Sequence, residues 1–441
     1  NFSPKHTLLR NAGFGAIESC LDSTSSCIHG FSQDYPQATF QFLSTYIPNT
    51  PNTGLYFATY DPSAYSKTFG FIGLTDPTHP GTMYVTANPP SAGQFTSTVK
   101  ISYDTVWCVY DGDWWDASNI YREWALKNAE WVRKGLLTQR TDVPAWGRDL
   151  TVWVNSHWQE LDIFNVTGGD GVVVTSRMKS IKERFGNPPE GIGLHWYEWD
   201  SLGYDPSSNY SKCLAYPLYP TQLTCGFDTH YPEYYPVREG FLKAVKEVQK
   251  IGVRVVPYIN GRLFDTSTDT WTYENGMATA AKESSPAFGS PHLTTYNESY
   301  GSHANFAVSC PATSYWQKKI TDAVTRAARL FEVDGVYLDQ IAAAGPRNCW
   351  DDTHNHTLGG GDYWVSGYRE MLSQCREAVT NDRIVLTESN AEPFMDGINV
   401  YLSLVAFSGN FAGETKIIPA FPSIYGGYYL SMGSEFFQND L

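Results

Sequence analysis

The sequence Phe-Glu-Val-Asp-Gly-Val-Tyr-Leu-Asp-Gln occupies residues 331–340 and decides the fold class of this chain. It follows a stretch with helical spacing of apolar residues, 315–330, and its centre is a short apolar run of the kind found in parallel strands. Asp339 comes directly after this run. The same arrangement recurs later, where the apolar run 383–387 precedes Glu388. We therefore predict two neighbouring parallel strands, each with an acid at its carboxyl end.

From residue 150 onward, strand-like and helix-like segments alternate. Helices are expected at 176–185, 235–250, 315–330 and 364–379, and strands at 150–154, 191–197, 253–259, 333–338, 383–387, 401–406 and 416–421. Such alternation predicts parallel βα units and, with this many of them, a (β/α)8 TIM-like barrel. No eighth unit is recognisable before Leu441. We expect it to be missing from this chain, or to be supplied by a C-terminal segment or a second chain.

Residues 1–110 have a different pattern. Short β-rich runs, separated by Pro, Gly, Asn and Ser, recur at 38–43, 54–60, 69–73, 83–87 and 96–103. This pattern is typical of an antiparallel β-sandwich, which we expect to be a structural module beside the barrel. Residues 111–146 form a predicted helical bridge, whose helix reaches about residue 134 and is capped by Asp116 or Ser118. Residues 147–441 remain for the barrel.

Composition restricts the class of partner. The formal net charge is −15 and no basic patch is present, so we expect no nucleic-acid partner. No run of about 18 apolar residues occurs, which predicts no membrane span. Aromatic residues make up 15% of the chain, and their rings suit the faces of sugars as well as they suit a core. No Gly-x-Gly-x-x-Gly or P-loop motif follows the first expected barrel strand, which argues against nucleotide binding.

Cysteines and sequons indicate the compartment. Two pairs of the eight cysteines, Cys20 with Cys27 and Cys213 with Cys225, bracket short loops and are expected to form local disulfides. Asn-x-Ser/Thr sequons occur at five positions: Asn1, Asn165, Asn209, Asn297 and Asn355. These features predict a secreted or secretory-pathway, glycosylated eukaryotic protein. The chain begins without Met, from which we expect that a leader has been removed.

Asp339 and Glu388 are the candidate catalytic residues. In a parallel barrel the carboxyl ends of the strands carry the chemistry, so both acids are expected at one mouth. Adjacent strands lie about 4.8 Å apart, which is compatible with the ~5–5.5 Å between the two carboxyl groups of a retaining glycosidase. We assign the shorter Asp339 as the nucleophile and the longer Glu388 as the acid/base. The alternative is a pair of solvated acids with a structural role.

Other strand ends carry side chains that suit sugar hydroxyls. An amide such as Asn260 can bond a hydroxyl, and the planar fork of Arg262 can orient a carboxylate. Charged side chains at the carboxyl ends of these strands would be poor core residues, so we expect them to line a pocket. The predicted substrate-binding residues are His195, Trp196, Tyr197, Trp199 and Asp200 on one strand end, Tyr258, Asn260 and Arg262 on the next, then Tyr337 and Gln340, and finally Asn390, Glu392 and Asp396.

The segment around His354 and His356 contains potential metal ligands, but we interpret it as an exposed loop. Asn355 between them is a sequon residue, and a glycosylated Asn belongs on a surface loop. No two cysteines form a Cys-x-x-Cys pair, which argues against zinc. We therefore assign no metal ligand and expect no required cofactor. A structural Ca²⁺ held by loop acids remains an open alternative.

Three motifs resemble known glycosidases. The runs Asp-Gly-Val-Tyr-Leu-Asp-Gln at 334–340 and Leu-Thr-Glu-Ser-Asn-Ala-Glu at 386–392 resemble the retaining α-glycosidases related to the α-amylase superfamily. The bridge Gly-Asp-Trp-x-Asp-Ala-x-x-x-Tyr-Arg-x-Trp at 112–124 is similar to that of an uncharacterised glycoside-hydrolase-like (β/α)8-barrel family related to the endo-α-N-acetylgalactosaminidases. The resemblance implies an aspartate nucleophile, Asp339, after the fourth strand and a glutamate acid/base, Glu388, after the fifth.

The resemblance to α-amylases is incomplete at two positions. Tyr337 stands where those enzymes have an arginine two residues before the nucleophile. Their third acid, in a His-Asp pair, has no match near Phe421. The resemblance therefore supports the type of reaction more than an α-glucan substrate.

Together these features predict a secreted retaining glycoside hydrolase that acts on an α-linked oligosaccharide, polysaccharide or glycoprotein glycan. A non-catalytic carbohydrate-binding or structural protein on the same barrel is the alternative, since a fold does not guarantee activity. A metal-dependent esterase or deacetylase ranks third. It would need several His and Asp residues at the strand ends, where we place only His195.

Overall fold

A computed structural model describes most of the chain. The described residues are 6–19, 30–48, 53–74, 76–90, 100–156, 172–197, 199–200, 215–216, 219–223, 229–237, 240–283, 293–300, 304–403 and 415–433. None of the helices in these ranges is both long enough and apolar enough to cross a membrane.

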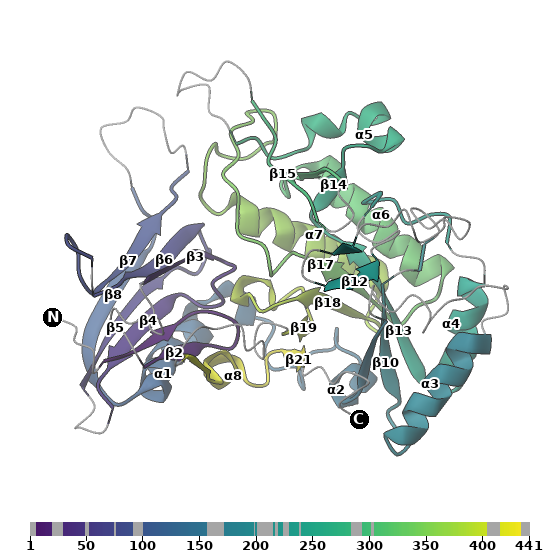
Figure 1. The fold of residues 1–441 in the computed structure, drawn as a ribbon, viewed down its shortest axis with the longest axis horizontal. Helices are drawn as coiled ribbons and strands as arrows, with labels where there is room; N and C mark the ends of the chain where they lie inside the picture. Colours follow the sequence, from purple (N-terminus) through teal and green to yellow (C-terminus); the bar gives the residue numbers. More distant parts are fainter. Residues whose placement is uncertain are drawn as a thin grey trace.

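Seven parallel strands form a nearly closed barrel, shown on the right of Figure 1. They follow one another in chain order: β9 (Trp153–Ser156), β10 (Ile192–Trp196), β13 (Val253–Asn260), β17 (Gly335–Asp339), β18 (Ile384–Glu388), β19 (Val400–Leu402) and β21 (Leu430–Met432). The strands expected at 191–197, 253–259, 333–338 and 383–387 are confirmed. The eighth strand of a (β/α)8 barrel is not present among the described residues.

Amphipathic helices cover the outside of the barrel: α3 (Val172–Arg184), α4 (Phe241–Lys250), α6 (Ser314–Leu330) and α7 (Tyr363–Val379). In α4 the buried residues Phe241, Ala244, Val245 and Val248 recur at the spacing of one helix face. Burying such a face against the sheet stabilises the barrel by about 25 cal/mol per Å² of apolar surface. The helices therefore hold the strand ends, and the side chains on them, in place.

The N-terminal part consists of two antiparallel sheets, on the left of Figure 1. The larger has the order β20 (Thr415–Ile417), β2 (Ala16–Glu18), β1 (Thr7–Arg10), β4 (Phe42–Tyr46), β5 (Thr53–Tyr60) and β8 (Asp104–Asp111). The smaller contains β3 (Gly30–Tyr35), β6 (Lys67–Ile72) and β7 (Thr82–Ala87). Rings such as Phe42, Tyr56 and Phe69 are completely buried, and the Phe42 ring packs against those of Tyr56 and Tyr121.

One strand prediction is wrong. The segment expected as a barrel strand at 416–421 contributes β20, which pairs antiparallel with β2 in the N-terminal sheet. Pro419 cannot donate to a strand ladder, and a short helix, α8 (Ala420–Tyr425), begins directly after it. The barrel takes its next strand from Leu430–Met432 instead. Residues 415–432 therefore connect the N-terminal sheet with the barrel.

The bridge helix α1 (Trp114–Asn128) begins earlier than expected. Its cap is Asp113, which accepts a hydrogen bond from the backbone N–H of Trp115, while Asp116 accepts one from the N–H of Asp113. The prediction of Asp116 or Ser118 as the cap is wrong, because Asp116 is the helical partner in this capping box. Arg122 on α1 donates to the carbonyl oxygens of Ser423 and Ile424, which fixes α1 against α8.

Smaller elements complete the described structure. They are η1 (Glu130–Val132), α2 (Ala145–Asp149), β11 (Ala215–Tyr216), β12 (Tyr219–Leu223), α5 (Asp269–Tyr273), η3 (Gly276–Ala278) and η5 (Glu392–Phe394), together with the antiparallel strands β14 (Leu263–Asp265), β16 (Phe306–Val308) and β15 (Asn297–Glu298). The last three follow the carboxyl end of β13 and bring Glu298 back to the barrel mouth.

Candidate active site

Two acids meet at the carboxyl ends of neighbouring barrel strands. β17 ends in Asp339 and β18 in Glu388, and the parallel register pairs Leu338 with Thr387 one residue before them. The two carboxyl groups interact directly, and Glu388 is one of the groups that act on the pKa of Asp339. Asp339 is 8% exposed, and Glu388 is half-buried. The sheet therefore brings together the two acids that the sequence singled out.

The strand β13 supplies hydrogen-bond donors to Asp339. Its register places Tyr258 opposite Tyr337 and Asn260 opposite Asp339. The Tyr258 hydroxyl donates to Asp339 Oδ2 over 2.7 Å, and Asn260 Nδ2 lies 3.3 Å from the same oxygen. Burial raises the pKa of Asp339 above its ordinary value, although the hydrogen bonds from Tyr258 and Glu388 oppose this change. These donors stabilise the ionised carboxylate inside a site that shields it from water.

A layer of rings lies beneath the two acids. Tyr197 stacks on Tyr258 with centroids 4.9 Å apart, and the His195 ring lies 4.1 Å from that of Tyr337. Burial lowers the pKa of His195 to about 3, so this ring is neutral. Its Nδ1 lies 3.2 Å from Asn155 Oδ1. His195, Tyr197, Tyr258 and Tyr337 thus join the predicted site from three adjacent strands.

A cleft of about 540 Å³ opens beside Glu388, a volume within the range of ligand sites. It lies between the N-terminal sheets and the barrel mouth. Gln33, Asp34 and Gln37 contribute from β3 and the segment that follows it. The barrel side contributes Arg262, Glu298, Tyr300, Gln340, Arg347, Glu388 and Ser389.

The barrel wall of the cleft contains a buried ion pair. Arg262 is 2% exposed and donates from Nη1 to Glu298 Oε2 over 2.8 Å and from Nη2 to Oε1 over 2.5 Å. Nη1 also donates to Gln340 Oε1 over 2.8 Å. Arg347 reaches Glu298 Oε1 over 2.9 Å. Burial opposes ionisation of Glu298, but the hydrogen bonds and charge of Arg262 outweigh it and lower the pKa of Glu298 to about 2.

Both predicted tryptophans lie away from the acids. Trp196 and Trp199 are 1% exposed, and Phe241 of α4 packs against both rings. Side chains alternate along a strand, so Trp196 shares the helix-facing side of β10 with Leu194, while His195 points the other way. Trp199 also donates to the carbonyl oxygen of Tyr258. Asp200 forms an isolated bridge with Val237.

The residues predicted after β18 do not gather at the cleft. Glu392 is completely buried and accepts hydrogen bonds from the hydroxyls of Tyr35, Tyr121 and Tyr425. Burial raises the pKa of Glu392 to about 7. This contact joins the N-terminal sheets to the barrel, so the position of Glu392 is that of an interface residue.

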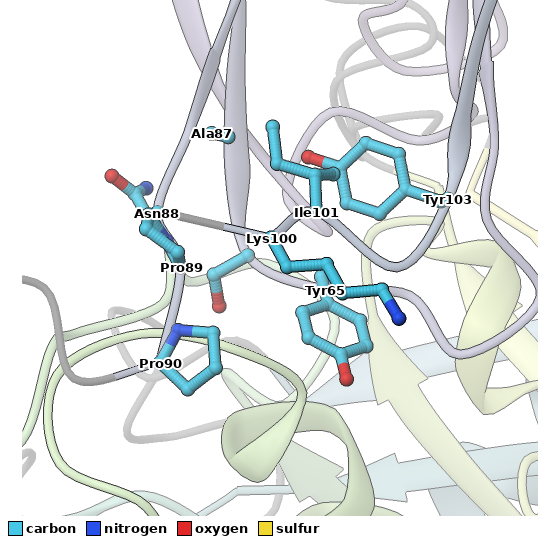
Figure 2. A pocket seen from close by; sticks show the side chains of 9 residues that line it. Tyr65, Ala87, Asn88, Pro89, Pro90, Lys100, Ile101 and Tyr103 are labelled. Atoms are coloured by element: carbon cyan, nitrogen blue, oxygen red, sulfur yellow. The ribbon is translucent and has the colours of Figure 1, made fainter. Parts of the chain in front are cut away.

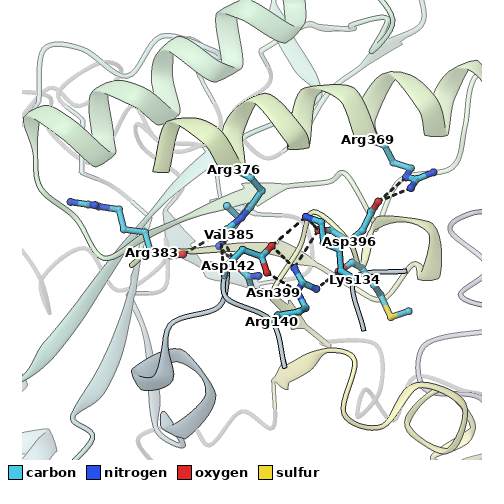
Figure 3. A network of polar contacts seen from close by, with 10 residues as sticks. Lys134, Arg140, Asp142, Arg369, Arg376, Arg383, Val385, Asp396 and Asn399 are labelled. Carbon is cyan, nitrogen blue, oxygen red and sulfur yellow. Dashed lines mark hydrogen bonds and ion pairs between the residues drawn. The ribbon is translucent and has the colours of Figure 1, made fainter. Parts of the chain in front are cut away.

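Asp396 and Asn390 have structural partners of their own. Asp396 forms an ion pair of 2.6 Å with Arg369 of α7, within the polar network of Figure 3. The same network includes Arg140, whose guanidinium pairs with Asp142. Asn390 Oδ1 accepts a hydrogen bond of 2.6 Å from Ser403.

A second pocket lies on the N-terminal part, between the residues that precede β6, the end of β7 and the chain that enters β8; Figure 2 shows its lining side chains. Tyr65, Pro90, Ile101 and Tyr103 are among its lining residues. Its volume is only about 10 Å³, which is room for about one water molecule. It is too small to hold a sugar.

The predicted modification sites lie partly outside the described residues. Cys20, Cys27, Cys213 and Cys225 are all outside them, as are Asn165 and Asn209. Asn297 and Asn355 are described and exposed. Cys108, Cys310, Cys349 and Cys375 carry free thiols.

Several cleft residues were missed from the sequence. Glu298 is the middle residue of the Asn297 sequon, so the sequence indicated glycosylation there and not a cleft residue. Its partner Arg262 is 36 positions away. Arg347 and Asp34 carry no local signal at all. Acids and bases that meet through loops can be found only once the loops are placed.

The chain is similar in sequence to one protein family and to two curated proteins over most of its length. The family described as "Domain of unknown function (DUF6259)" matches residues 99–212 and 222–436. A Monosiga brevicollis protein named "Putative glycoside hydrolase 22789" is 39% identical over 394 residues, 88% of this chain and 31% of that protein. A Bacteroides thetaiotaomicron protein named "Putative glycoside hydrolase" is 27% identical over 395 residues, 89% of this chain and 50% of that protein. The chain thus spans a third to a half of these relatives.

A solved structure shares the fold. The α-N-acetylgalactosaminidase NagBb of Bifidobacterium bifidum, in its Gal-NHAc-DNJ complex, matches with a TM-score of 0.67 at 11% identity. The match covers 98% of this chain and 64% of that one. At this identity the likeness concerns the fold alone. The family match covers most of the sequence, and the chain belongs to the DUF6259 family.

Proposed function

We propose that this chain is a retaining glycoside hydrolase that cleaves an α-linked glycan, with Asp339 as the nucleophile and Glu388 as the acid/base. The observation that carries the proposal is the placement of these two carboxyl groups at the ends of adjacent parallel strands, one residue beyond the paired Leu338 and Thr387. An inverting enzyme separates its carboxyl groups by about 6.5–9.5 Å to hold a water molecule between them. The ends of adjacent strands lie about 4.8 Å apart, which is closer to the ~5–5.5 Å of a retaining pair and favours retention.

The hydrogen-bond pattern supports the division of roles. Asp339 Oδ2 accepts hydrogen bonds from Tyr258 and Asn260, and such donors favour the ionised form of a carboxylate. We assign the proton of the pair to Glu388, which lines the cleft and can deliver it to a leaving group there. One ionised and one protonated carboxyl is the starting state that the first step of a retaining mechanism needs.

In the first step, an oxygen of Asp339 attacks the anomeric carbon of the bound sugar while the bond to the leaving oxygen breaks. Glu388 transfers its proton to that oxygen, so the aglycone leaves as an alcohol. The Asp339–sugar ester retains the electron pair that Asp339 supplied. Tyr258 and Asn260 hold Asp339 in line for this attack.

In the second step, Glu388, now a carboxylate, takes a proton from a water molecule that enters from the side the aglycone left. The water oxygen attacks the anomeric carbon and the ester bond to Asp339 breaks. Both carboxyl groups return to their starting protonation states, and two displacements give net retention.

The cleft supports a carbohydrate substrate. Asp34, Gln33 and Gln37 on one wall and the Arg262–Glu298–Arg347 cluster on the other offer donors and acceptors for hydroxyl groups. The names of the relatives support a glycan substrate, and the fold shared with an α-N-acetylgalactosaminidase supports an α linkage. We also propose that the protein is exported, which the exposure of Asn297 and Asn355 supports.

The proposal is tested by labelling the protein with a panel of activated fluoroglycosides and cyclophellitol-type probes, followed by mass mapping of the modified peptide. We expect an adduct on Asp339 that disappears in Asp339→Asn and persists in Asp322→Asn, an exposed acid on α6. An adduct on another acid would overturn the assignment of the nucleophile. Hydrolysis with inversion of the anomeric configuration would overturn the retaining mechanism.

A further inference from the structure

Four side chains with nitrogen and sulfur donors converge at the edge of the barrel mouth. Cys310 follows β16, while Cys349, His354 and His356 lie on the loop between β17 and α7. One donor atom from each lies within 4.8 Å of the other three. Three of these residues are buried, and His356 is half-buried. Only the folded chain brings them together.

Two thiols and two imidazoles form the ligand set of a closed zinc site. Zn²⁺ binds sulfur at about 2.3 Å and nitrogen at about 2.0–2.1 Å, almost always with four tetrahedral ligands where its role is structural. Ligands at those bond lengths lie within about 4 Å of one another, so a small inward movement would complete the sphere. Calcium and magnesium prefer oxygen ligands and do not fit this set.

The hydrogen bonds of both histidines leave the correct nitrogen available. His354 Nε2 lies 2.8 Å from the carbonyl oxygen of Ala278, so Nε2 carries the hydrogen and Nδ1 carries the lone pair. That Nδ1 faces Cys349 Sγ at 3.4 Å. His356 Nδ1 likewise lies 2.8 Å from the carbonyl oxygen of Thr357. A carbonyl that holds the far nitrogen of the ring is the usual outer partner of a metal-bound histidine.

The remaining nitrogen of His356 has no other role within the described structure. His356 Nε2 is buried, and apart from the Cys349 side chain of the cluster itself it has no hydrogen-bond partner there. Burying such an acceptor without a partner costs about 1–3 kcal/mol. The backbone N–H of Lys282 approaches Cys349 Sγ at 3.4 Å, as N–H groups do around metal thiolates. A bound cation would satisfy all four donors at once.

We propose that Cys310 Sγ, Cys349 Sγ, His354 Nδ1 and His356 Nε2 bind one Zn²⁺ in a closed tetrahedral structural site. With four protein ligands the ion has no open position for water, so its role is to hold the fold and not to catalyse. The metal ties the loop between β17 and α7 to the segment after β16.

The site has a consequence for the cleft. Arg347, two residues before Cys349, is the second arginine on Glu298. Cys349 is also paired with Gly359 through hydrogen bonds of 2.9 and 2.7 Å in both directions. Fixing Cys349 therefore fixes the loop that places Arg347 on the wall of the cleft. This role does not depend on the reaction proposed for Asp339 and Glu388.

The test is the metal content of the intact purified chain, prepared without chelators and measured by inductively coupled plasma mass spectrometry. We expect about one zinc per chain in the unaltered protein and in Cys375→Ser, which removes a buried thiol outside the cluster. We expect less than a tenth of that in Cys349→Ser and in His356→Ala. Zinc retained by both of these variants would overturn the proposal.

Two further measurements on the unaltered protein test the proposed zinc site even if the variants fail to fold. Exchange with Co²⁺ should produce the intense visible bands of a tetrahedral site and a thiolate-to-cobalt charge-transfer band. Bound cobalt without these bands would exclude the ligand set. A Cys310–Cys349 disulfide in the unreduced protein, found by peptide mass mapping in place of bound metal, would overturn the proposal.

Discussion

Tyr258 donates its hydroxyl hydrogen to Asp339 Oδ2 over 2.7 Å, from the strand adjacent to the one that Asp339 ends. The hydroxyl of Tyr231 in turn donates to that of Tyr258 over 3.2 Å. The result is a short chain of hydroxyls that ends on the proposed nucleophile. A hydrogen bond to an ionised acceptor is roughly twice as strong as one between neutral groups. Tyr258 thus favours the charged form of Asp339, which burial disfavours.

Replacing Tyr258 by Phe should move the acid limb of the pH–rate profile. The lost hydrogen bond stabilises ionised Asp339, so its removal raises the pKa of Asp339 further and less of the carboxylate exists at low pH. We expect the acid limb of kcat/KM to shift to higher pH, with activity at the optimum reduced by about tenfold, the equivalent of roughly 1.4 kcal/mol. Tyr231→Phe is the matched control and should shift the limb less. Identical limbs in both variants and the unaltered protein would contradict this role.

Asp339→Asn and Glu388→Gln should differ in their dependence on the leaving group. Glu388→Gln should lose about 10²–10⁴-fold with a substrate whose leaving group needs a proton. It should lose much less in the first step with an activated aryl glycoside, and azide should rescue it by forming a glycosyl azide. Asp339→Asn should be inactive with both substrates. The measurement is steady-state kinetics on the two substrates, and equal losses in both variants would argue against separate roles.

Glu298→Gln should lower the free energy of unfolding of the protein as well as disturb the wall of the cleft. The substitution leaves Arg262, 2% exposed, without the carboxylate that accepts both arms of its fork. Breaking a buried pair costs about 3–5 kcal/mol, so we expect a loss of about 3 kcal/mol in urea unfolding at pH 7. Glu332→Gln, which breaks an exposed ion pair with Lys246, is the control and should cost less than about 1 kcal/mol.

The same pair predicts a dependence of stability on pH. The pKa of Glu298 is lowered from 4.5 to about 2, so its contribution is present above pH 4.5 and is lost as the pH falls through about 2. Acid should therefore destabilise the unaltered protein more than Glu298→Gln. If the two free energies of unfolding change in parallel between pH 5 and pH 2, the ion pair contributes little.

The contribution of Glu392 to stability should depend on pH in the direction opposite to that of Glu298. Burial raises its pKa from 4.5 to about 7, so the folded chain holds a proton that the unfolded chain has lost between these values. Stability from this residue should therefore fall as the pH rises from 4.5 to 7, by roughly 3 kcal/mol in total. Glu392→Gln should keep the contacts with the tyrosines and flatten this part of the stability profile. Glu377→Gln, an exposed change on α7, should leave it unaltered.

The sequence by itself determined the strands and the acids that end them. Apolar runs with fixed periods dictate which segments become strands and helices, because each segment must bury its apolar side. β10, β13, β17 and β18 were predicted from this pattern, and so was the adjacency of Asp339 and Glu388. Local chemistry also indicated the antiparallel character of the N-terminal part. It did not locate the cap at Asp113, because several acids near the helix start could serve.

Only the tertiary structure decided which distant side chains meet. Trp196 and His195 are neighbours in sequence, but the strand directs Trp196 to the packed helices and His195 toward the rings beneath Asp339. Residues 415–417 join the N-terminal sheet before the chain returns to the barrel at 430–432. The Arg262–Glu298 pair and the Cys310–Cys349–His354–His356 cluster depend on loops that fold over the barrel mouth. Periodicity specifies the direction of a side chain within its own element, whereas contacts across the sequence depend on how elements and loops pack.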